Sequence, residues 1–259
     1  MDDYTIDKER RMKGKYRFSA LIIAALIAIP AGYGQSQSSS SEMSVEESHL
    51  QEAVDMMIVR ETSKQDSQEQ KLISLAFMGD LIEQGNTSDE LRLVLEHLSL
   101  EGTNVQAREK GRLKNEFPEV RRQAVRHLGS FNTDEAKIAL LRVCVADNEP
   151  VVLQEAVRSL GIIGIDKEGE VIETIVWVTN KFTNSVSPDN LLAIAAIDAI
   201  QKIVQNNNSV REGAFQLLIK ISVGPYSPSV REKARKTLMD MRNLIANSGR
   251  AKSPQAQAK

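Results

Sequence analysis

Cysteine, aromatic residues and histidine are scarce in this sequence. Cys144 is the only cysteine among 259 residues, so no disulfide can form within the chain and no zinc site can be built on cysteines. Aromatic residues make up only 4% of the chain. Together with the predominance of alanine and aliphatic residues, this disfavours an all-β sandwich and favours closely packed helices. The formal net charge of −2 provides no overall attraction to nucleic acid or to an anionic membrane.

Motifs of catalysis are also missing. None of the three histidines, His49, His97 and His127, belongs to a spacing that sets two metal ligands on one helix face. The chain has no P-loop, no Gly-x-Gly-x-x-Gly and no Gly-x-Ser-x-Gly. We therefore expect no catalytic residue, no metal site, no cofactor and no enzymatic activity. Cys144 lies among aliphatic residues and is expected to be buried, and His127 to lie at the surface or cap a helix end.

The first 34 residues have the order of a secretory signal peptide. Basic residues precede an apolar run over 18–29, and small residues follow it up to Gly34. Because the run is shorter than the ~20 residues that span a bilayer, we expect cleavage after Gly34 and a periplasmic or other extracytoplasmic location. An uncleaved segment that anchors the protein in the inner membrane is the alternative, and it would be the protein's only contact with a membrane. Residues 35–43 are expected to form a flexible leader.

One sequence pattern recurs through the rest of the chain. Residues 118–129 match residues 150–161 at seven positions with an offset of 32. Their shared skeleton is an aliphatic residue, an alanine four residues later and an aliphatic residue after four more, which places all three on one helix face. It occurs as Val120, Ala124, Leu128; Val152, Ala156, Leu160; Leu192, Ala196, Ile200; Val210, Ala214, Leu218; and Val230, Ala234, Leu238. We expect this face to be buried, with each alanine where a neighbouring helix comes close.

The pattern predicts an all-α fold of antiparallel helix pairs. Pro118 and Pro150 suit helix starts, Gly129 and Gly161 lie near helix ends, and Thr133 and the 187–189 stretch suit caps. The expected pairs are 88–100 with 118–130, 133–147 with 150–164, 168–182 with 188–205, and 209–223 with 229–246. A polar capping unit is expected at 44–87, the repeat domain at 88–247, a long exposed connection at 101–117 and a disordered basic tail at 248–259.

Three short stretches carry a family resemblance. Glu119-Val-Arg121, Ser209-Val-Arg211 and Ser229-Val-Arg231, each followed by the alanine and leucine above, resemble the second helix of HEAT repeats, including the HEAT-like repeats named after phycobilisome lyases. The resemblance implies an α-solenoid of a secreted bacterial type, with the second helices lining a concave face and some arginines bonding between repeats. HEAT-like hydroxylases carry His-Glu pairs, but Glu96-His97 has the reverse order, so no di-iron centre is expected.

These features favour an exported scaffold that binds a protein or an acidic peptide on the concave face. The candidate partner-binding residues are Arg121, Arg122, Arg126, Arg158, Arg231, Arg235 and Arg242. Ordinary solvated charge is the competing interpretation. Nucleic acid is not expected as a partner, and Trp177 is expected in a core or inter-repeat contact, with an exposed hot spot as the alternative. A structural subunit of an envelope assembly, or a lyase-like or hydroxylase-like accessory enzyme, is the alternative function.

Overall fold

A computed structural model describes residues 45–103, 108–109, 112–183, 188–207 and 209–251. The predicted signal peptide and leader lie outside this part. Residues from Val45 onward form one compact unit, whose described part contains ten α-helices and one pair of short strands. The helices are α2 (Val45–Ser63), α3 (Gln68–Glu83), α4 (Asp89–Ser99), α5 (Pro118–Leu128), α6 (Asp134–Ala146), α7 (Pro150–Ile163), α8 (Glu170–Thr183), α9 (Asn190–Asn207), α10 (Glu212–Val223) and α11 (Pro228–Ala251).

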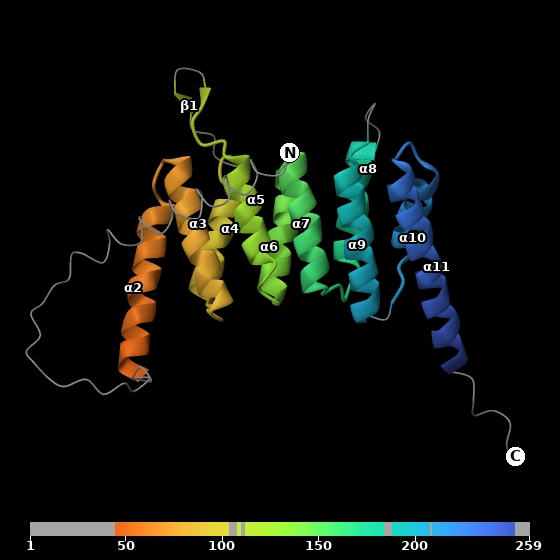
Figure 1. Cartoon of the computed structure of the whole chain (residues 1–259), viewed down its shortest axis with the longest axis horizontal. Coiled ribbons are helices and arrows are strands. Elements are labelled where there is room, and N and C mark those ends of the chain that lie inside the picture. Colours follow the sequence, from red (N-terminus) through yellow and green to blue (C-terminus); the bar gives the residue numbers. More distant parts are fainter. Residues whose placement is uncertain (1–44, 104–107, 110–111, 184–187, 208, 252–259) are drawn as a thin grey trace, which may run out of the picture. The chain divides into compact units, whose positions relative to one another are not determined.

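The helices form two layers that follow the order of the chain. The first-helix layer consists of α2, α4, α6, α8 and α10, and the second-helix layer of α3, α5, α7, α9 and α11; neighbours pack against each other within each layer. Each first helix also packs on the helix that follows it. Figure 1 shows these helices standing side by side from α2 to α11. The fold is therefore an all-α solenoid of helix pairs, as the repeated pattern predicted.

Local sequence explains where several helices begin. Pro118 and Pro150 each occupy the first turn of a helix, where the missing N–H costs no bond. The Thr133 hydroxyl accepts a hydrogen bond from the backbone N–H of Ala136 and caps α6. Asp189 does the same for α9 by accepting from the N–H groups of residues 191 and 192. Both predicted caps are thus present.

The repeated aliphatic–alanine–aliphatic skeleton forms the core. Thirteen of its fifteen side chains are buried, and only Val210 and Leu238 are partly exposed. Val210 departs from the pattern for a local reason. Helix α10 begins at Glu212, with Arg211 as the residue before its first turn, so the 209–211 stretch precedes a first helix and is not part of a second helix.

Gly161 is a packing residue rather than a helix end. It lies within α7, and a Cβ placed on it would come within 2.6 Å of the Cα of Ala199 on α9. Gly129 is the C-cap of α5, as expected for a helix end, and it also packs closely, since a Cβ there would lie 2.7 Å from the Ser159 hydroxyl on α7. The two glycines therefore let successive second helices approach closely. Helix α7 instead ends at Gly164, whose φ of 66° suits glycine.

The long connection between α4 and α5 carries a short antiparallel strand pair. β1 (Arg108–Glu109) pairs with β2 (Arg112–Leu113), with Glu109 opposite Arg112. The base of the connection is closed by Gly102, which has a φ of 74°; a Cβ there would lie 2.1 Å from the carbonyl oxygen of Asn115. The predicted loop is thus a small hairpin on a tightly packed base.

The C-terminal helix is longer than expected. α11 continues to Ala251, four residues into the segment predicted to be disordered, because extending an existing helix adds one hydrogen bond for each residue fixed. Residues 252–259 lie outside the described part. Among the helices that the structure describes, none combines the length and apolar character needed to cross a membrane.

Candidate functional site

The structure removes Arg121 from the predicted partner-binding set. Its side chain is only 3% exposed and forms an ion pair with Asp147, with its Nε 2.7 Å and its Nη2 3.3 Å from the carboxylate oxygens. Its Nη1 donates to the carbonyl of Glu101. Asp147 also accepts hydrogen bonds from the N–H groups of Asn148 and Glu149 at the start of α7. Arg121 therefore joins two repeats, a role that the family resemblance implied for some arginines. Its burial leaves it unable to contact a partner.

The next arginines on α5 and α7 lie at the surface beside carboxylates. Arg122 donates two hydrogen bonds to Glu119, at 2.7 and 2.8 Å, and this contact lowers the pKa of Glu119 below its ordinary value despite partial burial. Glu155, which is nearly buried, lies 3.9 Å from Arg122 and 3.6 Å from Arg158. Arg158 is 56% exposed and Arg126 is exposed as well. Arg122 and Arg158 thus share Glu155, and Arg122 also contacts Glu119.

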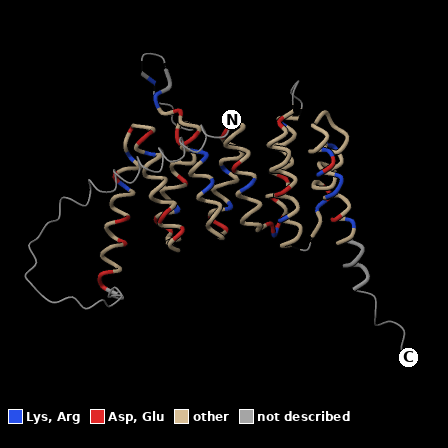
Figure 2. Tube along the Cα trace, viewed as in Figure 1, with Lys and Arg blue, Asp and Glu red and all other residues tan. Residues whose placement is uncertain are grey.

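Two cations at the C-terminal end are paired with acids. Lys233 of α11 contacts Asp198 of α9 at 2.7 Å, and Arg235 contacts Glu232 at 3.3 Å. Arg235 also donates to the carbonyl of Ser222. Figure 2 shows Lys and Arg bands on α11 with Asp and Glu bands among them.

Arg231 and Arg242 complete the predicted set. Arg231 is half-buried at the repeat position of Arg121, and within the described residues its buried Nε has no hydrogen-bond partner. Arg242 is exposed in the middle part of α11. The predicted arginines are therefore spread over α5, α7 and α11 and do not form one cluster.

Apolar side chains accompany the arginines on the second-helix layer. Val151 at the start of α7 and Leu191 at the start of α9 hold the same repeat position and are 46% and 62% exposed. Ile162 is 52% exposed, one turn beyond Arg158 on α7. We call the exposed residues Arg126, Val151, Arg158, Ile162 and Leu191 the second-helix surface.

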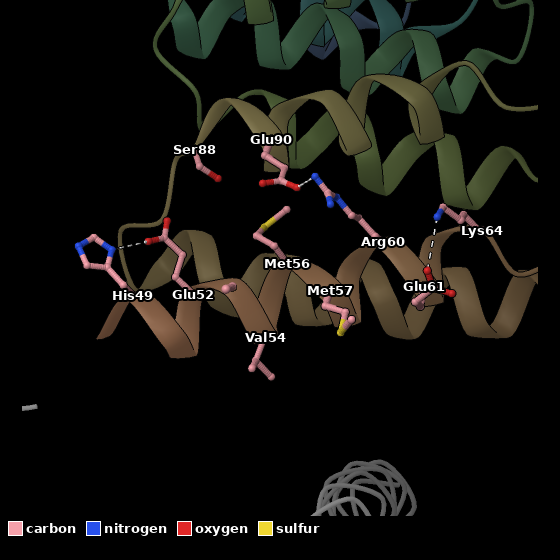
Figure 3. Close-up of a pocket in the computed structure, with 11 residues that line it drawn as sticks. His49, Glu52, Val54, Met56, Met57, Arg60, Glu61, Lys64, Ser88 and Glu90 are labelled. Atoms are coloured by element: carbon pink, nitrogen blue, oxygen red, sulfur yellow. Dashed lines mark hydrogen bonds and ion pairs between the residues drawn. The ribbon is translucent and has the colours of Figure 1, made fainter. Parts of the chain in front are cut away.

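A groove of about 680 Å³ lies along α2 (Figure 3). Arg60 pairs there with Glu90 of α4, Lys64 lies 3.4 Å from Glu61, and the ring of His49 lies 3.9 Å from Glu52. Figure 3 shows Met56 pointing toward α4, while Val54 and Met57 point away from it. Because its cations lie beside carboxylates, the groove offers apolar contacts rather than free charge. Sequence reasoning missed it, since it depends on how α2 and α4 pack.

Potentially reactive side chains in the described part are held in structural settings. Cys144 is fully buried, and burial raises the pKa of its thiol to about 12, so the reactive thiolate is suppressed. His127 is half-buried against Gly79, and burial, reinforced by Arg126, lowers the pKa of its imidazole. Within the described ranges no three His, Cys, Asp or Glu side chains gather where they could hold a metal ion.

Trp177 was expected in a core or inter-repeat contact, and the structure excludes the core position. It is 47% exposed on α8, because the buried face of that helix is formed by Val171, Ile172, Ile175 and Val178. The apolar run around Trp177 covers more than one face of the helix, so sequence spacing alone did not show which residues turn outward.

Paired helices in two layers, with one face of each helix buried, define the class of α-solenoid repeat proteins. Residues 106–181, from the hairpin into α8, match the family model of HEAT repeats. This segment therefore carries HEAT repeats, as the resemblance indicated. A search of curated protein sequences found no match to the chain. HEAT repeats commonly mediate protein–protein interaction.

Proposed function

We propose that this protein is an exported, non-catalytic scaffold that binds an acidic segment of a partner protein across its second-helix surface. The observation that carries the proposal is the placement of Arg126 and Arg158. They hold the same repeat position on adjacent helices and both are exposed. Arg158 lies 3.6 Å from Glu155, and Arg126 forms no ion pair within the described part of the chain.

The spacing of these helices suits an extended acidic chain. Axes of packed helices lie about 8–10 Å apart, and residues two or three apart in an extended segment are separated by roughly 7–10 Å. A segment that crosses α5 and α7 could therefore present one carboxylate to Arg126 and another to Arg158. Val151, Ile162 and Leu191 would add apolar contacts around the two ion pairs.

A site-specific photo-crosslinker tests the surface in the native cell. We expect a crosslinker at Ile162, one turn from Arg158, to capture a defined partner, and a crosslinker at the equally exposed Leu93 of α4 to capture none. Reversing both charges with R126E and R158E should abolish capture at 162. R142E, at an exposed arginine of α6, is the matched control and should leave capture unchanged. Capture at 162 that survives R126E and R158E would exclude this mode of binding.

Export is tested separately on the intact N-terminus. The basic, apolar and small-residue order of residues 1–34 supports secretion with cleavage after Gly34. Cell fractionation with mass spectrometry of the purified protein should find a chain that begins at Gln35 outside the cytoplasm. A full-length chain in the inner membrane would support the anchored alternative, and an intact chain in the cytosol would reject export.

A further inference from the structure

Trp177 stands on the first-helix layer, away from the arginines of the proposed surface. It is the only tryptophan of the chain and is 47% exposed. The ammonium of Lys181, one turn along α8, lies 5.5 Å from the centre of its ring. An exposed tryptophan that is held in place by a cation offers a large contact area at little further cost in side-chain entropy.

Two lysines near Trp177 are positioned without being neutralised. Lys181 donates to the side-chain oxygen of Asn148 at 2.6 Å, and Lys220 of α10 donates to that of Asn180 on α8, also at 2.6 Å. Both partners are neutral amides, and in the described part of the chain neither lysine lies within ion-pair distance of a carboxylate. By contrast, Arg122, Lys233 and Arg235 on the second-helix layer each contact an acid.

Exposed aliphatic side chains flank these lysines on the neighbouring helices. Val145, near the end of α6, is 66% exposed, and Ile219 and Val223, at the end of α10, are 50% and 76% exposed. Since α8 packs between α6 and α10, the apolar residues lie on both sides of the helix that carries Trp177. The exposed acid on α8 nearest in sequence is Glu173, one turn before Trp177.

We propose that these residues form a second docking site, for an acidic peptide segment that carries an aromatic or aliphatic side chain. The site, called here the Trp177 surface, consists of Val145, Trp177, Lys181, Ile219, Lys220 and Val223. The uncompensated lysines would pair with two carboxylates of the peptide, and its apolar side chain would pack on Trp177. Nucleic acid is a less suitable ligand, because its binding depends on many phosphate contacts and this surface offers only two lysines. The proposal does not rest on the second-helix surface.

The test uses peptides as the probe and Trp177 as the reporter. Random 12-residue peptides displayed on phage would be selected on the full-length protein and counter-selected on W177A. We expect enrichment of peptides in which Asp or Glu flanks Phe, Tyr, Leu or Ile. Because Trp177 is the only tryptophan, titration of a selected peptide that lacks tryptophan should change the intrinsic fluorescence saturably.

Matched variants separate this site from others. K181Q with K220Q should weaken peptide binding on the order of tenfold, and more strongly at low salt. K202Q, at an exposed lysine of α9, should change it less than about twofold, and R126E with R158E should leave it intact. Circular dichroism would show that the variants remain folded.

Four outcomes would overturn the proposal. The first is enrichment of peptides without acidic residues, and the second is unchanged affinity in the double lysine variant. The third is tight peptide binding that leaves the fluorescence of Trp177 unaltered. The fourth is displacement of the bound peptide by anionic vesicles or an oligonucleotide at a lower concentration than free peptide requires. The surface would then serve lipid or nucleic acid, and the peptide assignment would be rejected.

Discussion

Helix α7 has packed neighbours on both sides within its layer, whereas α2 stands at the end of its layer beside α4. The difference shows in their sequences. α7 buries Val152, Ala156, Leu160 and Gly161 completely, while α2 leaves Leu50 and Met57 each 67% exposed. Small residues are required only where a second backbone must come close, so the repeat pattern is strict in the middle of the array and degenerates at the N-terminal end.

The comparison extends to polar groups. In the middle, Arg121 and Asp147 are 3% and 2% exposed and depend on each other. At the N-terminal end, Arg60 and Glu90 form their pair at the surface, 59% and 39% exposed. A buried charge that loses its partner is far more costly than an exposed one. The following variants test whether the middle and the end differ in this way.

The largest effect is expected for R121M. This change leaves the Asp147 carboxylate buried without its ion-pair partner and should lower the free energy of unfolding by about 3 kcal/mol. R126M is the control, since it replaces an exposed arginine on the same helix and should cost less than about 0.5 kcal/mol. Urea denaturation followed by circular dichroism measures both. Equal effects of the two variants would mean that the buried ion pair contributes no more to stability than an exposed arginine does.

The second prediction concerns the close approach of α7 and α9. G161A places a methyl group against the backbone of Ala199, so the helices must separate and the stability should fall by about 1–3 kcal/mol. Leucine at Ala156 or Ala196, both fully buried, should have a similar cost. G213A on α10 is the control, because the nearest atom to its Cβ would be Val176 Cγ2 at 3.7 Å. G213A should leave the free energy of unfolding unchanged or raise it by up to about 1 kcal/mol, because alanine has the higher helix propensity.

Much of the middle of the array could be predicted, because the four-residue spacing of the skeleton indicates both that a segment is helical and which of its faces is buried. The skeleton residues Val120, Ala124 and Leu128 recur with the same face inward, and the expected helix pairs appear near their predicted ranges. Thr133 and Pro150 gave helix starts by local chemistry that needs no tertiary contact.

The surface could not be predicted as well, since two faces of some helices are apolar. On α6, Ile138, Leu141 and Val145 follow one another at helical spacing, yet Ile138 and Val145 are 44% and 66% exposed. The buried face instead contains alanines, Leu140, Val143 and Cys144. Trp177 was misplaced for the same reason.

Candidate site residues were predicted least well, because charge on a helix says nothing about the neighbouring helix. Arg121 and Arg122 are adjacent in sequence, but Arg121 points between repeats to Asp147 and Arg122 to the surface. The lysine–asparagine pairs near Trp177 join residues 33 and 40 positions apart. Only the packing of α6, α8 and α10 brings them together.

The third prediction lies where the N-terminal pair meets the repeats. His127 of α5 packs against Gly79 of α3, and burial lowers the pKa of its imidazole below the ordinary value of about 6.5. Since the unfolded chain then binds the proton more tightly, stability should be retained above pH 6.5 and fall as the pH drops below it. H127Q should flatten this part of the pH profile. A wild-type profile that coincides with that of H127Q between pH 5 and 7 would contradict the shift.

The smallest effect is expected at the outer side of α2. Met57 is 67% exposed and Met56 only 5%, although they are adjacent and chemically identical. M57Q should change the free energy of unfolding by less than about 0.5 kcal/mol, whereas M56Q should cost roughly 1–3 kcal/mol because it buries an amide without assigned partners. Denaturation midpoints of the two variants, measured side by side, test this directly. If M57Q were as destabilising as M56Q, the outer side of α2 would have to be covered in the folded protein, and the contrast between the end and the middle of the array would disappear.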